Sequence, residues 1–225
     1  MAEAAVGRGE MAIQSFTGGA FGQNSLLVAC ARTRAAILVD PGAATPQLLQ
    51  AVRVGEYQVE QIVLTHAHLD HVEGVSEAKR ETGAPILLHP ADQPLYDGAP
   101  QQAEWFGMQM DPLPPVDGSL AEGEAVSFGE CELAVRFTPG HAPGHVILVG
   151  DGVAIVGDCV FAGSIGRTDL PGGDLGQLMH SIRTQILTLP DATTLLPGHG
   201  PETTVGHERA SNPFLVPQFG GSAFA

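Results

Sequence analysis

Basic side chains are scarce in this sequence of 225 residues. It has 10 Lys and Arg against 25 Asp and Glu, its formal net charge is −15, and Lys79 is its one lysine. Because contacts with nucleic-acid phosphates require clustered Lys and Arg, this balance excludes nucleic acid as an expected partner. The same shortage of positive charge disfavours binding to an anionic membrane surface.

Cysteines and long apolar runs are also few. The three cysteines, Cys30, Cys131 and Cys159, are scattered, and one would be left over after pairing. This arrangement predicts reduced thiols and a cytoplasmic location rather than a disulfide framework. The sequence has no stretch of about 18 apolar residues, so no membrane span is expected, and residues 1–10 lack the apolar core of a signal peptide.

The composition instead predicts one globular domain with a short tail. Hydrophobic residues make up 44% of the sequence, which is enough to bury a core. We expect residues 1–10 to form a flexible tail and residues 11–225 to form a single domain.

Short apolar segments bounded by Gly, Pro and Asp predict many strands and few helices. We expect strands at 11–17, 25–30, 36–40, 61–65, 84–89, 126–128, 131–137, 146–149, 153–156 and 193–196, and helices at 45–54, 75–82, 175–188 and 205–210. Residues 98–118 are predicted to be irregular, and their large side chains either form an apolar lip over a site or cover the core or a subunit contact. Strands that outnumber helices predict sheets covered by helices.

The segment Thr65–His71 has the spacing of a metal site. His66 and His68 are two residues apart, so on an extended strand both rings leave the same face and can meet one ion. Asp70 and His71 follow where the chain must turn, and they can serve a neighbouring ion. Imidazole and carboxylate ligands suit zinc, iron or manganese.

Three further segments place a histidine or a carboxylate beside glycine after a predicted strand. They contain His141 and His145, Asp158, and His199. Together with the first segment they supply more ligands than one ion can use: His66, His68, Asp70, His71, His141, Asp158 and His199. A carboxylate can bridge two ions about 3.5–4 Å apart, so the set favours a two-metal site.

The order of these segments resembles the metallo-β-lactamase superfamily. The matching motifs are HAHLDH at 66–71, TPGHAPGH at 138–145, Gly157-Asp158, PGHG at 197–200 and the early turn Asp40-Pro41-Gly42. The resemblance implies an α/β fold, a four-layer αβ/βα sandwich with the metals at one edge of two sheets. It also implies that His66, His68 and His141 bind one metal, that Asp70, His71 and His199 bind another, and that Asp158 bridges them.

Residues 163–174, which include Gly166-Arg167-Thr168-Asp169, indicate which groups within the superfamily this sequence resembles. They are similar to a loop shared by short glyoxalase II-like hydrolases and persulfide dioxygenases, and the segment after His199 resembles the glyoxalase II-like group. This resemblance implies a metal-dependent hydrolase of small-molecule thioesters, such as S-(2-hydroxyacyl)glutathione. It also implies two divalent metal ions, with zinc as the first candidate and iron or manganese as alternatives. Asp70 and Asp158 would hold the ions whose shared hydroxide attacks the thioester carbonyl.

Two alternatives share these motifs. A persulfide dioxygenase would use one ferrous ion, although the second histidine of TPGHAPGH, here His145, is typically absent from that family. A lactonase or β-lactamase is a further alternative, which the loop at residues 163–174 disfavours.

Three residues outside the ligand set are predicted to support the site. Arg167 either grips a substrate carboxylate through bidentate hydrogen bonds or forms an internal ion pair with Asp169 or Asp174. His145 either contacts the substrate, supports a ligand or is a buried core histidine. Asp40 is expected to steer a ligand histidine by hydrogen bonding.

Overall fold

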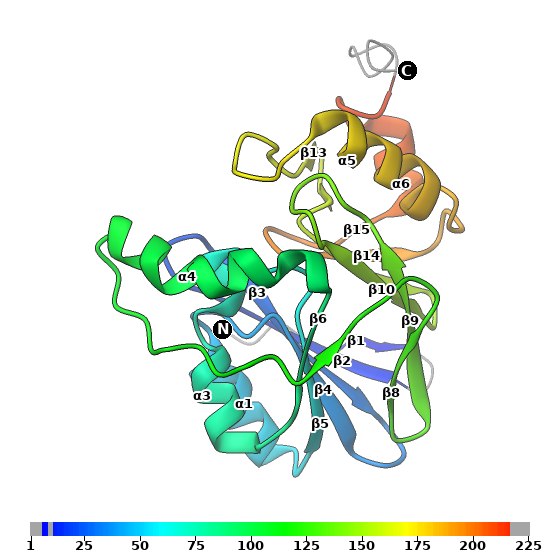
Figure 1. Ribbon diagram of the computed structural model, residues 1–225. Helices are drawn as coiled ribbons and strands as arrows, with labels where there is room; N and C mark the ends of the chain where they lie inside the picture. Colours follow the sequence, from blue (N-terminus) through cyan, green and yellow to red (C-terminus); the bar gives the residue numbers. More distant parts are fainter. Residues whose placement is uncertain (1–5, 9–10, 217–225) are drawn as a thin grey trace.

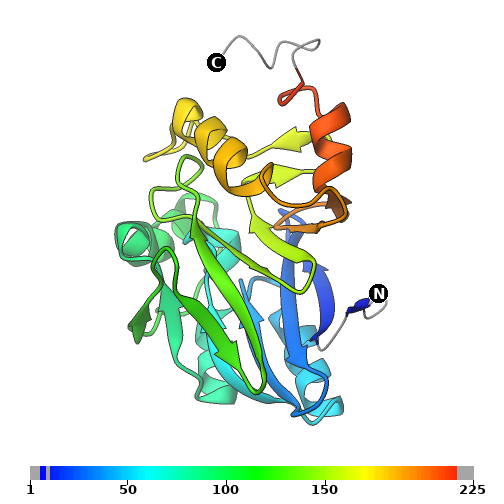
Figure 2. The same ribbon diagram turned by 90° about the vertical axis from the view of Figure 1, so that its right-hand side faces the viewer.

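The computed structural model describes residues 6–8 and 11–216. Two β-sheets pack face to face, and helices cover the outer face of each sheet (Figures 1 and 2). The predicted four-layer αβ/βα sandwich is therefore confirmed.

The first sheet has seven strands, and its spatial order follows the sequence. Its first four strands are antiparallel, and parallel pairing follows from the fourth strand onward. The strands are β1 (Val6–Arg8), β2 (Met11–Gly18), β3 (Gln23–Cys30), β4 (Ala35–Val39), β5 (Gln58–Val63), β6 (Ile86–Leu88) and β7 (Gly118–Ser119). The parallel crossovers carry α1 (Thr45–Val54), α2 (Leu69–Val72), α3 (Val75–Thr82), a 3₁₀ turn (Pro90–Asp92) and α4 (Gln93–Trp105).

The second sheet has six strands in the order β15-β14-β11-β10-β9-β8. These are β8 (Ala125–Phe128), β9 (Cys131–Phe137), β10 (Val146–Gly150), β11 (Val153–Gly157), β14 (Thr194–Pro197) and β15 (Thr203–Thr204). A hairpin of β12 (Val160–Phe161) and β13 (Ser164–Ile165) follows β11. The outer helices are α5 (Leu175–Ser181), which continues into a π turn (Ile182–Ile186), and α6 (Val205–Ser211).

Three apolar cores separate the four layers, because the central strands bury both of their faces. In β3, Val28 belongs to the core between the sheets, whereas Leu27 belongs to the core under the helices α1, α3 and α4. The third core places Leu178 and Ile182 of the α5 segment against the second sheet. Such two-sided burial explains why these strands read as continuous apolar runs rather than as alternating ones.

Two expectations about chain segments need correction. Within the predicted tail, Val6–Arg8 form β1, paired antiparallel with β2; residues 1–5 and 9–10 lie outside the described part of the chain. The predicted irregular region 98–118 begins inside the helix α4, which buries Tyr96, Ala99 and Ala103 at helical spacing although it contains Pro100. The remainder, from Phe106 to the start of β7, is irregular as expected.

Among the described residues, no helix is long and apolar enough to cross a membrane.

Candidate metal centre

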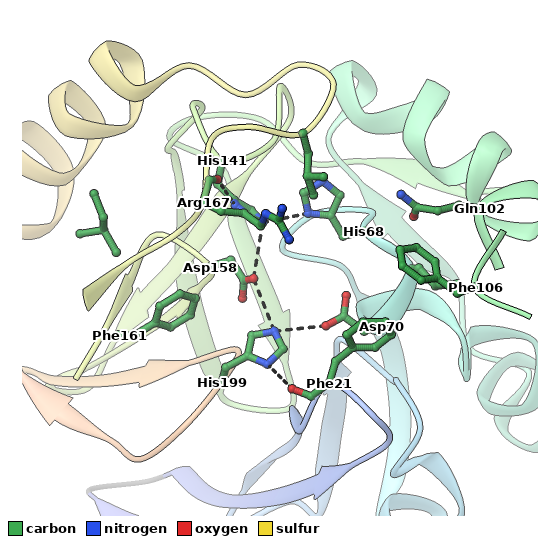
Figure 3. Close-up of a pocket in the computed structure, with 13 residues that line it drawn as sticks. Phe21, His68, Asp70, Gln102, Phe106, His141, Asp158, Phe161, Arg167 and His199 are labelled. Carbon is green, nitrogen blue, oxygen red and sulfur yellow. Dashed lines mark hydrogen bonds and ion pairs between the residues drawn. The ribbon is translucent and has the colours of Figure 1, made fainter. Parts of the chain in front are cut away.

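The predicted ligands lie beyond the ends of strands at one edge of both sheets, in loops and in the short helix α2. Figure 3 shows five of them around one cavity. The loop of residues 64–68 follows β5, and His141 lies in the loop after β9. Asp158 directly follows β11, and His199 comes two residues after β14. Polar residues placed just beyond strand ends can meet without disturbing the apolar cores.

Hydrogen bonds from the first sheet fix the position of the segment that carries His199. The N–H of Asn24 in β3 donates to the carbonyl oxygen of Gly198 over 2.8 Å, and its side-chain amide donates to two more carbonyls of the same segment. A side chain at Gly198 would collide with Asp158 Oδ1 and the His71 ring, so this close approach requires glycine. The two sheets are thus tied together at the site.

The strand that precedes the histidine pair ends earlier than predicted. It ends at Val63, so His66 and His68 lie in a loop and not on an extended strand as the sequence argument assumed. Their rings still converge, with centroids 4.8 Å apart. His68 immediately precedes the single turn of α2, which carries Asp70 and His71.

The structure brings six of the seven predicted ligands together in two groups, and the seventh, Asp158, lies between them. Within each group the candidate ligand atoms lie within 4.8 Å of one another. The groups are His66, His68 and His141, and Asp70, His71 and His199. Each group therefore combines residues that precede β6 with a histidine from the second sheet.

Asp158 lies between the two groups. Its Oδ1 is 3.3 Å from His71 Nε2 of the second group. Its Oδ2 is 3.4 Å from His141 Nε2 of the first group and 3.5 Å from His199 Nε2 of the second. One carboxylate thus faces both groups, as the bridging role requires.

Asp40 fixes the orientation of two ligand rings. Its Oδ2 lies 2.9 Å from His71 Nδ1 and accepts the Thr65 hydroxyl proton over 2.6 Å. The Thr65 oxygen is then free to accept from His66 Nδ1 at 3.1 Å. Asp40 could also form a third group with His66 and His71, but both its oxygens already accept hydrogen bonds from Thr65. Its position therefore matches the predicted steering role.

Backbone carbonyls orient two further rings. His141 Nδ1 donates to the carbonyl oxygen of Arg167 at 2.8 Å, and His199 Nδ1 donates to that of Phe21 at 3.0 Å. Both rings therefore present the Nε2 lone pair to the cluster. His68 is different, since its Nδ1 lies 2.8 Å from His141 Nε2 and itself faces the first group.

Several buried polar atoms at this point have no hydrogen-bond partner among the described residues. They include His66 Nε2, His71 Nε2 and Asp158 Oδ1. A buried polar atom without a partner is costly, and such atoms gathered at one point indicate a missing ligand. Divalent cations fit this donor set, because imidazole and carboxylate are ligands of zinc, iron and manganese.

The electrostatics differ between the two groups. Burial holds the pKa of His66 well below its usual value and lowers the pKa of His68 to about 3, so both rings are neutral. Burial also acts on His71 and His199, but neighbouring carboxylates, Asp158 first, outweigh it and raise their pKa values, that of His199 to about 10. The histidines of the first group are therefore neutral, whereas those of the second group are paired with the carboxylates of Asp70 and Asp158.

His145 does not occupy the predicted substrate position. Its ring is fully buried, it does not line the pocket, and its Nε2 accepts the backbone N–H of Asp158 at 3.1 Å. Its Nδ1 is 2.9 Å from Thr138 Oγ1. Because both ring nitrogens are engaged with protein atoms, the ring supports Asp158 instead. The neighbouring Cys159 is buried in the core under α5.

A cavity of about 370 Å³ opens onto the two groups. Its floor is formed by ligand residues of both groups together with Asp158 (Figure 3). Arg167 borders it with a side chain that is 61% exposed, and its guanidinium makes a bidentate pair with Asp169 at 2.7 and 2.8 Å. Asp174 instead caps α5 by accepting the N–H of Gln177.

Three residues near the site were not predicted from the sequence. Phe21, from the β2–β3 turn, and Gln102, from α4, both line the cavity. Asp92 is fully buried and accepts the backbone N–H groups of Ala67 and Gly144, and burial raises its pKa to about 6. The signal for Asp92 was a carboxylate just beyond a strand at the same edge of the sheet. The sequence held no such signal for the other two residues.

Comparisons with known proteins agree with this geometry. Residues 18–199 match the Metallo-beta-lactamase superfamily. The chain is 38% identical over 205 residues to the hydroxyacylglutathione hydrolase GloC of Haemophilus influenzae, covering 87% of this chain and 94% of that protein. Two solved structures are also similar. The BLEG-1 B3 metallo-beta-lactamase has a TM-score of 0.84 and 32% identity over 91% of this chain and 99% of that one. TTHA1623 in a di-iron-bound form has a TM-score of 0.81 and 39% identity over 89% and 99%.

Proposed function

Because this chain belongs to the metallo-beta-lactamase superfamily, we propose that it hydrolyses thioesters of a small anionic thiol, with S-(2-hydroxyacyl)glutathione as the first candidate. The observation that carries the proposal is the carboxylate of Asp158, which faces two ligand groups beneath an open cavity. The hydroxyacylglutathione hydrolase relative and the loop around Arg167 support the thioester assignment. The proposal includes a cytoplasmic location, which three buried cysteine thiols that form no disulfide support.

We assign the first group of ligands to one divalent ion and the second group to another, with Asp158 shared between them. Zinc is the first candidate, and iron and manganese suit the same donors; the di-iron form of TTHA1623 makes iron a specific alternative. Bound there, two divalent ions would supply an activated water and polarise a carbonyl oxygen.

The protein's own residues perform the remaining tasks. The outer hydrogen bonds to His66, His71, His141 and His199 fix the ring orientations, so that no side chain must rearrange during the reaction. In the proposed complex the scissile carbonyl would lie over Asp158, in the cavity that Arg167 borders. A thiolate leaves without strong help from a general acid, so no serine or cysteine nucleophile is needed.

Metal content and substrate preference test this proposal together. Purified protein is subjected to elemental analysis and assayed with S-lactoylglutathione, with glutathione persulfide in an oxygen electrode, and with a β-lactam. About two metals per chain with thioester turnover would support it. One iron with oxygen uptake would favour the dioxygenase, and β-lactam turnover alone would favour a β-lactamase like BLEG-1.

Arg167→Ala should raise the KM for an anionic thioester by about 10-fold, because a charge-assisted hydrogen bond is worth about 1.5–3 kcal/mol and this one is exposed. The value of kcat should change little, since the backbone carbonyl that orients His141 stays in place. Steady-state kinetics of the two proteins measure both constants. Asp169→Ala, which releases the guanidinium from its ion pair, should leave KM equal or lower. An unchanged KM in Arg167→Ala would reduce Arg167 to an internal ion-pair partner.

A further inference from the structure

Two aromatic rings form one wall of the cavity. Phe21 from the β2–β3 turn and Phe106 at the end of α4 pack edge to face, with ring centroids 5.9 Å apart. Their exposed fractions are 42% and 60%, although large apolar side chains are usually buried. Leu69 also lines the cavity. Figure 3 shows the two rings on the side of the cavity where Asp70 lies.

The cation at the cavity lies on a different segment of the chain. Arg167 belongs to the loop after β13 and, among the described residues that line the cavity, is the one Lys or Arg. Phe161, Ile165 and Leu170 of the same segment also line the cavity. The cavity therefore combines one cation with apolar lining, and Phe21, Leu69 and Phe106 come from other segments of the chain than the cation. A substrate with one anionic arm and one apolar arm would match both, and thiol carriers such as glutathione are anionic.

We propose that Phe21, Phe106 and Leu69 form a subsite for an apolar acyl chain, so that the thioesters this protein prefers carry an aliphatic acyl group longer than a short 2-hydroxyacyl group. The inference rests on the proposed thioester hydrolysis and specifies its substrate class. The thiol arm would then extend toward Arg167, and the carbonyl between the two arms would lie over Asp158.

Binding of thioethers tests the subsite without turnover. S-methyl-, S-propyl- and S-hexylglutathione cannot be hydrolysed, and calorimetry with metal-loaded protein gives their dissociation constants. The Kd should fall by about fourfold per methylene while the chain contacts the wall, which corresponds to about 0.8 kcal/mol for each buried CH₂. Phe106→Ala should reduce this to less than about twofold, and Phe21→Ala should do the same independently.

Trp105→Ala is the matched control, because Trp105 precedes Phe106, is 76% exposed and does not line the cavity. It should leave the chain-length dependence unchanged. A wild-type Kd that is constant along the series, or a dependence that survives in both Phe variants, would overturn the subsite. If the series binds as expected but no thioester is hydrolysed, the proposed function fails and the apolar subsite stands.

A second inference concerns the buried carboxylate of Asp92. Its Oδ2 accepts the N–H of Ala67 at 2.9 Å, and its Oδ1 accepts the N–H of Gly144. Ala67 lies between His66 and His68, and Gly144 lies three residues after His141 in the next ligand loop. One side chain, itself fully buried, therefore links the two loops that carry the whole first group.

We infer that Asp92 is a positioning residue for the first metal. With each of its oxygens bonded to one loop, it sets the separation between the histidine pair and His141. Asp92→Asn keeps the volume but replaces one acceptor oxygen with an NH₂ group, which cannot accept an N–H. Metal affinity at the first group should then fall about 10–100-fold, as for other outer partners of metal ligands.

Cobalt(II) substitution separates positioning from a merely structural role. Asp92→Asn should shift the visible absorption spectrum of the bound cobalt and raise its Kd. Asp97 is an exposed carboxylate in the adjoining helix α4, where it accepts a hydrogen bond from Gln93. Asp97→Asn should leave both the spectrum and the Kd unchanged. A lower melting temperature of the metal-free protein with an unaltered spectrum and Kd would make Asp92 structural only.

Gly144→Ala perturbs the same link from the other loop, because a Cβ there would meet the backbone nitrogen and Oδ1 of Asp92. Gly144→Ala replaces Asp92→Asn as the test variant if Asp92→Asn does not fold. The same spectral shift and weaker binding are expected. An unchanged spectrum and Kd would overturn the inference.

Discussion

Asp158→Asn should lower thioester turnover by more than about 100-fold, because loss of an inner ligand must exceed the 10–100-fold cost of losing an outer one. The substitution keeps the shape of the side chain and its backbone N–H bond to His145. It removes the negative charge that faces His71, His141 and His199. Both groups then lose the donor they share, so metal content should also fall below two per chain, as measured by elemental analysis.

Asp151→Asn provides the control for this substitution. Asp151 lies in the exposed turn between β10 and β11 with a φ of 49°, a conformation that asparagine tolerates well. Its substitution should change neither metal content nor turnover. If Asp158→Asn kept two metals and a rate within tenfold of the unaltered protein, the shared-carboxylate assignment would be wrong.

Removal of metal should lower the melting temperature by roughly 5–11 °C. Ligand at 100 times its Kd stabilises a fold by about 2.7 kcal/mol, and each kcal/mol moves the melting temperature of a domain of this size by about 2–4 °C. The physical reason is the set of buried ring nitrogens and the Asp158 oxygen that lack hydrogen-bond partners among the described residues. Differential scanning calorimetry before and after chelation and dialysis measures the change.

Adding back zinc, manganese or ferrous iron should restore the melting temperature, whereas magnesium should not, since it prefers oxygen ligands. His180→Ala is a useful control, because His180 lies in α5 and belongs to neither ligand group. Its metal-dependent change in melting temperature should equal that of the unaltered protein. Equal melting temperatures with and without metal would contradict the view that these groups bind ions.

The ligand set was predictable from sequence because its members follow strands and stand beside glycine or at a turn. The spacing of His66, His68 and His71 is typical of metal ligands. Gly157 and Gly198 stand where the backbone passes close to side chains of the site, so that no Cβ would fit. The layers were predictable for a similar reason, since strands buried on both faces read as continuous apolar runs.

The surroundings of the site were less predictable. The helix α4 was missed because Gly98 and Pro100 weaken its pattern, although the buried positions 96, 99 and 103 keep a helical period. Phe21 enters the cavity only because the turn between β2 and β3 reaches the His199 loop. Such contacts join residues 178 positions apart, and local pattern carries no information about them.

Each of the two ligand groups takes residues from both sheets, and Asn24 fastens the same edge through the His199 loop. Any motion that parts the sheets at this edge must therefore stretch the coordination sphere of each ion. Bound ions would therefore hold the two sheets together at this edge and slow the opening of the sandwich there.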